Sequence, residues 1–181
     1  GSPNVAVGME ALEANTTGTE NTAIGFRALE ANTTGATNVA VGSYALDVNN
    51  ADNNTAIGYD TLTANTTGAS NVAVGKDALE ANTTANYNTA VGASALKTNT
   101  TGTQNTAVGY GALEDQTTGD YNVAIGIEAG RNLTTGSTNT IIGRNAMDGV
   151  VTGDENTAVG ANSLTACTSG AQNQAVGVYA L

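Results

Sequence analysis

The side chains of this chain that could do chemistry are few in kind. Its 181 residues include 16 carboxylates, 5 lysines and arginines, 6 tyrosines, one cysteine and no histidine. The lack of histidine excludes a Ser-His-Asp triad, and the single Cys167 excludes a disulfide scaffold or a His/Cys metal centre. We therefore expect no enzyme and no cofactor. What remains is binding chemistry: carboxylates for cations, aromatic rings for sugars and hydroxyls for ordered water.

The carboxylates are clustered, as at Glu114, Asp115 and Asp120 or at Asp154 and Glu155. Calcium takes about six to eight oxygen ligands, but neither an Asp-x-Asp-x-Asp-Gly spacing nor a Gly-Gly-x-Gly-x-Asp repeat is present. We interpret these carboxylates as a solvated acidic surface and expect no metal. A net charge of −11 disfavours nucleic acid, whose phosphates it repels. No apolar run is long enough to span a membrane, so we expect no membrane insertion.

All of these residues belong to a sequence repeat, in which each kind of residue holds particular positions. The pentapeptide Asn-(Thr/Val)-Ala-(Val/Ile)-Gly recurs with small variations, and its spacing is seventeen positions in every case but one, where it is sixteen. It begins at Asn4, Asn21, Asn38, Asn54, Asn71, Asn88, Asn105, Asn122, Asn139, Asn156 and Asn173. Counted from its asparagine, each unit reads Asn-(Thr/Val)-Ala-(Val/Ile)-Gly-x-x-Ala-Leu-x-x-Asn-Thr-Thr-Gly-x-x. Residues 1–3 are a lead-in in which Gly1 and Ser2 resemble a cloning remnant, and 4–181 form one array.

Positions 1 to 5 of the unit predict a short strand that ends at glycine. Position 4 is always Val or Ile, so we expect it to face a core, whereas the alanine at position 3 lies where space is tight. No charged residue enters these five positions, and all the carboxylates fall at positions 7, 10, 11 and 15 to 17. This pattern indicates an inside and an outside.

The rest of the unit predicts a return segment. Ala-Leu-x-x-Asn at positions 8 to 12 is compatible with a second short strand or a single helical turn, with the leucine buried. Asn-Thr-Thr-Gly then predicts a turn whose Asn and Gly adopt positive φ. In one unit Gly130 replaces this leucine and Leu133 follows three residues later, so we expect the apolar anchor to move there. The missing residue near Asn50 should shorten a turn and leave the strands undisturbed.

A unit this short cannot bury a core alone, but stacked units can. We therefore predict an all-β fold, a parallel β-solenoid or β-roll of eleven coils that rises about 4.8 Å per coil. The invariant asparagines and glycines would then stack as structural ladders. They include Asn21, Asn38, Asn71, Asn105, Gly25, Gly42, Gly75 and Gly109.

So few bulky side chains per coil bury little apolar surface for the entropy lost on ordering the chain. We therefore expect a further apolar contact, a homo-trimer of rods, to which the small alanine at position 3 would permit close approach. The chain would then have itself as its first partner.

Two stretches, Asn105 to Leu113 and Ala129 to Gly136, look like the tandem repeats of tail-fibre-type proteins of bacteriophage and of marine and environmental bacteria. The Asn-x-Ala-Val/Ile-Gly motif also resembles the head repeats of YadA-like trimeric autotransporter adhesins. That resemblance implies a left-handed parallel β-roll trimer, located extracellularly on a cell surface or a virion fibre. The unit here is longer than theirs and has its own Asn-Thr-Thr-Gly turn.

Aromatic side chains are the first binding candidates, because rings on a fibre can stack on sugars. Phe26, Tyr59 and Tyr110 share position 6, Tyr44 and Tyr179 share position 7, and Tyr87 and Tyr121 share position 17. The sequence separates them by several coils, which also fits scattered surface residues. A surface polysaccharide or a host receptor is the partner that we expect for Phe26, Tyr59, Tyr110, Tyr87 and Tyr121.

Threonine pairs such as Thr16-Thr17 and Thr66-Thr67 are the second candidates. Rows of threonine on a flat face could order water as in ice-binding solenoids, but their turn context also suits hydroxyls bonded to the local backbone. The Asn-x-Thr sequons in the same turn follow from the repeat itself. The sequence thus predicts an adhesive fibre segment, with an ice-binding solenoid and a passive spacer as alternatives.

Overall fold

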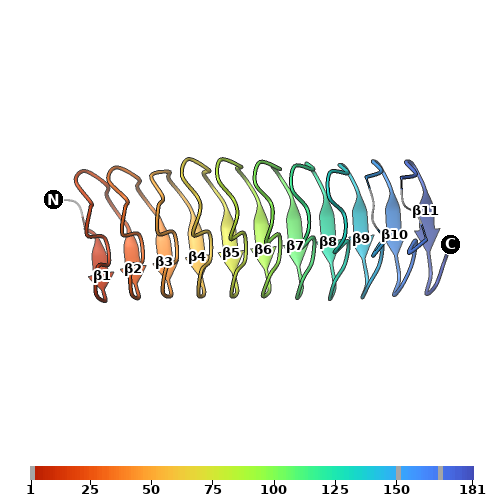
Figure 1. The fold of residues 1–181 in the computed structure, drawn as a ribbon, viewed down its shortest axis with the longest axis horizontal. Coiled ribbons are helices and arrows are strands. Elements are labelled where there is room, and N and C mark those ends of the chain that lie inside the picture. Colours follow the sequence, from red (N-terminus) through yellow and green to blue (C-terminus); the bar gives the residue numbers. More distant parts are fainter. Residues whose placement is uncertain (1–2, 150–151, 167–168) are drawn as a thin grey trace.

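The chain forms a single stack of coils along one axis, as the computed structural model shows (Figure 1). The structure describes residues 3–149, 152–166 and 169–181, so Cys167, Gly1 and Ser2 lie outside the described residues. Each coil contributes one strand of 3 residues, at positions 2 to 4 of its unit. The strands are β1 (Val5–Val7), β2 (Thr22–Ile24), β3 (Val39–Val41), β4 (Thr55–Ile57), β5 (Val72–Val74), β6 (Thr89–Val91), β7 (Thr106–Val108), β8 (Val123–Ile125), β9 (Thr140–Ile142), β10 (Thr157–Val159) and β11 (Gln174–Val176).

All eleven strands belong to one parallel sheet in sequence order, and the described residues contain no helix. The predicted all-β parallel solenoid is therefore confirmed. Every strand pairs with the next in the register of the repeat, so that Ala90 lies beside Ala107. The short unit keeps this register, since Ala40 pairs with Ala56 across the missing residue. As predicted, the deletion is absorbed in a turn.

The return segment is a run of turns, so the predicted second strand or helical turn over positions 8 to 12 is wrong. Positions 7 and 9 have left-handed backbone, with φ of 58° at Arg27 and 53° at Leu29. Two left-handed residues so close together interrupt both a right-handed helix and an extended strand. The amide of Leu29 donates instead to the carbonyl of Ala45 in the next coil, at 3.0 Å. Bonds between coils override the helical propensity of Ala-Leu-Glu-Ala.

The core is a narrow column of alanine and leucine between the strand and the return segment. Ala73 at position 3, Ala78 at position 8 and Leu79 at position 9 are fully buried, and other coils repeat this arrangement. The buried leucine was predicted correctly. The prediction that position 4 faces the core is wrong, because Ile57 and Val91 are 40% and 37% exposed. Inside the coil the leucine leaves room only for a methyl group at position 3, so the β-branched side chains lie outside.

Glycine at position 5 is required for two independent reasons. Its φ lies between 129° and 143° in all eleven coils, a region that other residues rarely adopt. A Cβ at Gly75 would also lie 2.6 Å from the carbonyl carbon of Gly92 in the next coil. The chain therefore turns out of each strand at a point where neighbouring backbones are in direct contact.

The Asn-Thr-Thr-Gly segment turns without the predicted positive φ at its Asn and Gly. The left-handed residue lies two positions later, at position 17, as at Gln104 with φ 58°. Glycine at position 15 serves close approach instead, because a Cβ at Gly18 would lie 2.4 Å from the carbonyl oxygen of Gly35. The same Cβ would lie 2.4 Å from Asn15 Oδ1, so both the neighbouring coil and the asparagine of the turn itself exclude a side chain here.

Two ladders of buried asparagines run along the coils. At position 1 the backbone amide of each asparagine donates to the side-chain oxygen of the preceding one, as from Asn38 to Asn21 at 2.9 Å. At position 12 the side-chain amide of Asn82 donates to Asn65 Oδ1 at 2.8 Å. Both ladders also donate to the carbonyl at position 15, and Gly35 O accepts from Asn21 Nδ2 and Asn32 Nδ2. The ladders thereby tie the strand, the turn and the adjacent coil together.

Candidate functional site

The outward side chains of the sheet form an aliphatic face. Since position 3 points inward, positions 2 and 4 of each strand point away from the core. Position 4 supplies Val7, Ile24, Val41, Ile57, Val74, Val91, Val108, Ile125, Ile142, Val159 and Val176, and position 2 supplies Val5, Thr22, Val39, Thr55, Val72, Thr89, Thr106, Val123, Thr140, Thr157 and Gln174. In-register pairing aligns these side chains in two straight rows along the stack of Figure 1. We call this surface the aliphatic face.

The aliphatic face lies on the side of the strand opposite to the one that the sequence predicts for position 4. It contains no charged residue, although the chain carries 16 acidic and 5 basic side chains. The row at position 4 is entirely Val and Ile, whereas the row at position 2 mixes Val with Thr and Gln174. Large exposed apolar surfaces are uncommon on monomeric proteins and are typical of interaction surfaces. The signal was present in the sequence, because alanine at position 3 alternates with Val or Ile at position 4. We assigned the larger side chain to the interior, whereas the narrow coil accepts only the smaller one.

A charged ladder runs along the return segments, where side chains at positions 7 and 10 meet. Arg27 forms an ion pair with Glu30 of its own coil and lies 3.6 Å from Glu10 and 3.7 Å from Asp47 in the two adjacent coils. Each basic residue of this ladder thus bridges several carboxylates. The ladder consists of Glu10, Arg27, Glu30, Asp47, Asp77, Glu80, Lys97, Glu114, Glu128 and Arg131.

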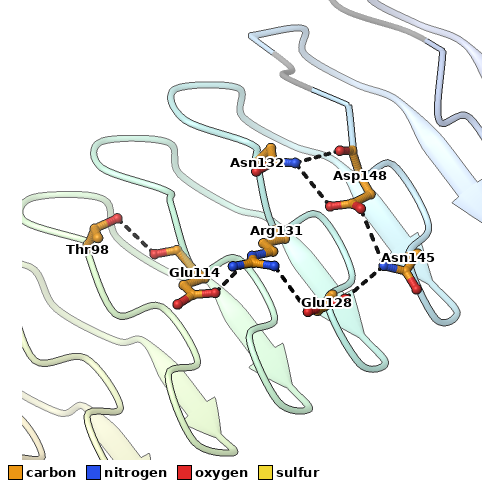
Figure 2. Close-up of polar contacts among 7 residues, drawn as sticks. All are labelled: Thr98, Glu114, Glu128, Arg131, Asn132, Asn145 and Asp148. Atoms are coloured by element: carbon orange, nitrogen blue, oxygen red, sulfur yellow. Dashed lines mark hydrogen bonds and ion pairs between the residues drawn. The ribbon is translucent and has the colours of Figure 1, made fainter.

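Figure 2 shows how the ladder continues in the second half of the chain. Arg131 lies 3.0 Å from Glu114 Oε2 and 3.2 Å from Glu128 Oε1. Asn145 Nδ2 then donates to Glu128 Oε2 at 3.0 Å and to Asp148 Oδ2 at 3.3 Å. These contacts join side chains of successive coils. They are partly exposed, so each pair contributes little, and the arrangement mainly spreads the acidic charge along the rod.

Burial raises the pKa of three carboxyl groups on and beside this ladder. Burial raises the pKa of Asp47 to about 6, against the charge of Arg27 and with a further increase from Glu30. Burial also raises the pKa of Asp60 and of Asp148. In the described residues one group of three carboxylates, Glu10, Glu13 and Glu30, brings oxygens within 4.8 Å of one another. Arg27 pairs with two of them, so the chain provides its own cation there.

The aromatic candidates divide into two groups. Phe26, Tyr44 and Tyr59 lie in three consecutive coils and pack edge to face, with ring centroids 5.2 Å and 6.0 Å apart. Our expectation that several coils separate the aromatic residues is wrong for these three, because Tyr44 at position 7 lies between two residues at position 6. The Arg27 guanidinium lies 5.6 Å from the centre of the Tyr44 ring. These rings pack against one another, although Tyr59 remains 48% exposed.

The second group remains on the surface. Tyr110, Tyr87 and Tyr121 are 54%, 65% and 56% exposed, and among the described residues none of their rings packs against another ring. Tyr87 and Tyr121 share position 17, and Tyr110 lies in a different turn of its coil. Of the five predicted ligand-facing residues, Phe26 and Tyr59 thus belong to the packed group and the other three to this one.

The threonine pairs have divided roles. At position 13, Thr66 Oγ1 donates to the carbonyl of Thr83 at 3.0 Å, and Thr83 Oγ1 donates to that of Thr100 at 3.1 Å. These hydroxyls therefore form hydrogen bonds between adjacent coils. The position 14 threonines, such as Thr84 and Thr101, are exposed and form a row of their own. Of the sequon asparagines, Asn32, Asn65, Asn82 and Asn99 are fully buried, which removes them as glycan acceptors in the folded chain.

Comparison with protein-family models, with curated proteins and with solved structures returns no match. The fold and the surfaces described above are therefore the basis for assigning a function. Within the described residues no helix has the length and apolar character that crossing a membrane requires.

Proposed function

We propose that this chain is a non-catalytic structural segment of an extracellular fibre, displayed on a cell surface or a virion, in which three rods associate through their aliphatic faces. The observation that carries the proposal is the uncharged row of Val and Ile along β1 to β11, of which Ile125 is 42% exposed. Covering this row in an oligomer would remove much apolar surface from water. The proposed contact is thus the strand's outer face and not, as the sequence suggested, the small alanine.

The occupant that best fits this face is another copy of the same chain. The face repeats once per coil, so a partner must present apolar groups with the same period to contact it along its whole length. A second rod has that period by construction. The trimer, rather than the dimer, follows the resemblance to the head repeats of trimeric adhesins. The charged ladder lies on the return segments and would remain in solvent, where its net negative charge keeps the fibre soluble.

The oligomeric state tests this proposal. We expect light scattering of the purified chain at micromolar concentration to give three times the mass of one chain. We also expect the unfolding temperature to rise with concentration, because association stabilises the folded form. A folded monomer with a concentration-independent unfolding temperature would contradict the proposal.

A pair of matched variants locates the contact. Val91→Asp with Val108→Asp places two carboxylates on the aliphatic face and should yield folded monomer, because the charges would be buried without partners. Thr84→Asp with Thr101→Asp adds the same charge at exposed positions of the 13–14 turn and should remain trimeric. Circular dichroism reports folding. If the two double variants have the same oligomeric mass, the contact between rods does not lie on the aliphatic face.

The exposed threonine row at position 14 supports one alternative function, ice binding. Its hydroxyls recur in consecutive coils at Thr67, Thr84 and Thr101, although the shortened coil with Asn50 and Ala51 interrupts the row. Thermal hysteresis at millimolar protein measures this activity directly. An absence of hysteresis would leave the fibre segment, and a glycan array would then distinguish an adhesive fibre from a passive spacer.

A further inference from the structure

The second aromatic group differs from the first in that, among the described residues, its rings have no contact with another ring. Tyr87 and Tyr121 are 65% and 56% exposed, which are high values for side chains of this size. Phe26, Tyr44 and Tyr59, by contrast, lie against one another. A ring that is exposed without a packing role can stack on a flat apolar ligand face, and its hydroxyl can make a hydrogen bond.

The fold fixes the spacing of these two rings. Tyr87, Gln104 and Tyr121 occupy position 17 of three consecutive coils, with nearly equal φ of 60°, 58° and 58°. Hydrogen bonds between coils hold this row in register: the amide of Tyr121 donates to Thr103 O at 3.1 Å, and that of Gln104 donates to Asn86 O at 3.1 Å. The two tyrosines are two coil spacings apart, a distance of about 9.6 Å at the usual spacing of strands.

The residues around the rings are polar. Gln104 is exposed between the two tyrosines, and its amide can both donate and accept. Ser70 and Thr138 continue the same row on either side. The nearby Asp120 is used structurally, since its Oδ1 accepts from the amide and the hydroxyl of Thr103. The row therefore offers two aromatic faces with neutral hydrogen-bonding groups between them.

We propose that the row Tyr87–Gln104–Tyr121 binds a neutral, extended β-1,4-linked polysaccharide lying along the rod axis. In such a ribbon alternate sugars present the same face, so the ligand repeats over one disaccharide, a length close to the separation of the two tyrosines. Each ring would stack on one sugar, and Gln104 would bond the hydroxyls of the sugar between them. The acidic charge of the rod repels polyanionic glycans and so selects for neutral ones.

This inference rests on the proposed fibre segment, to which it adds a ligand, and it is independent of the trimer. Calorimetric titration of the full chain with cellohexaose and with chitohexaose should show saturable binding of at least one. Sulfated or uronic-acid oligosaccharides of equal length should not bind. Tyr121→Ala should weaken binding about tenfold, because one stacking contact is lost. Tyr110→Ala removes an equally exposed tyrosine outside the row and should bind as the unmodified chain does.

The sharpest variant exchanges two residues of the row. Gln104→Tyr with Tyr121→Gln keeps the composition but places the rings in adjacent coils, about 4.8 Å apart, where they stack on each other. We expect binding to fall to the level of Tyr121→Ala. Unchanged affinity in the exchanged variant, or no binding by the unmodified chain, would overturn the proposal.

Light scattering on the same samples tests the trimer separately from the polysaccharide site. A trimer that binds no oligosaccharide refutes the polysaccharide site and leaves the fibre, whereas a monomer that binds through Tyr87 and Tyr121 refutes the trimer alone.

Discussion

Position 12 of the coil, which lies in the interior, is polar in one region of the rod and apolar in another. In coils 1 to 6, position 12 is asparagine, and Asn82 and Asn99 are fully buried members of the ladder. In the coil that begins at Asn122, the same position is Leu133, also fully buried. Strand pairing is unaffected by this change, since β8 pairs with β7 and β9 in the usual register. The backbone is therefore specified by features that both regions share.

In the apolar region, side chains from two neighbouring coils share one space in the interior. Gly130 stands where other coils have leucine, and a Cβ there would lie 2.7 Å from Ile141 Cδ1 and 3.0 Å from Leu113 Cδ2. Ile141, in the following coil, takes the place of the usual alanine at position 3 and is fully buried. One coil thus gives up its leucine, and the next coil fills the space.

The polar region shows where a ladder fails. Asn32 Oδ1 and Asn99 Oδ1 are buried without a hydrogen-bond partner. After Asn32 comes the shortened coil, where Asn49 Nδ2 donates to Ala51 O. After Asn99 comes Gln116, whose Nε2 donates to Gly119 O at 2.6 Å. Both unpaired oxygens lie next to an irregularity, so a polar interior depends more on exact repetition than an apolar one.

The largest expected effect is at Gly130. Gly130→Leu alone should destabilise the chain by about 3 kcal/mol, because the new side chain overlaps Ile141, and Ile141→Ala alone should cost about 2–4 kcal/mol through the cavity it leaves. Together the two changes restore the usual Leu and Ala. The double variant should therefore be more stable than either single one, as measured by urea unfolding. Additive losses would show that the two residues do not share one space.

The next effect is the loss of one ladder member. Asn82→Leu removes its bonds to Asn65 Oδ1 and to the carbonyl of Ala85 and leaves buried polar atoms unpaired. We expect a loss of about 2–3 kcal/mol in unfolding free energy. Leu133→Met, an apolar exchange of similar volume at the same position, should cost less than about 1.5 kcal/mol. Equal losses would mean that the hydrogen bonds of the ladder contribute nothing beyond packing.

A smaller gain should come from repairing the ladder. Gln116→Asn gives the following coil an amide short enough to reach Asn99 Oδ1, as Asn82 reaches Asn65, and should stabilise the chain by about 1 kcal/mol. Thermal unfolding measures the change. Gln116→Leu is the control and should destabilise, because it leaves Asn99 unpaired and takes away the bond to Gly119 O. A destabilised Gln116→Asn would show that the local backbone has adapted to glutamine.

The smallest effect concerns the charged ladder, which both regions share. Because the pKa of Asp47 is raised from 3.8 to about 6, the folded chain binds this proton more tightly than the unfolded chain. Stability therefore falls as pH rises through that window. Asp47→Asn should add about 1 kcal/mol at pH 7, discounted for partial exposure, and little at pH 4. Urea titrations at both pH values test this, with the exposed Glu13→Gln as control. An equal shift at both pH values would contradict it.

Part of this structure could be predicted from the sequence, and part could not. The repeat length, a short strand within positions 1 to 5, the buried leucine and the harmless deletion all follow from residue types and spacing. The return segment was predicted wrongly, because Ala-Leu-Glu-Ala favours a helix locally, whereas the amide of Leu29 bonds to the next coil. The packed group of Phe26, Tyr44 and Tyr59 was missed because the rings meet across coils from two different positions.

The sequence by itself determined that the chain is a stack, because so short a unit with one leucine cannot bury a core alone. It also determined which positions exclude charge. Only the tertiary structure decided which side of each strand faces inward. That choice depends on the space left beside Leu79, which admits the methyl group of Ala73 and turns Val74 outward. The alternation of side chains along a strand defines two faces, but only the packing inside the coil decides which face points to the core.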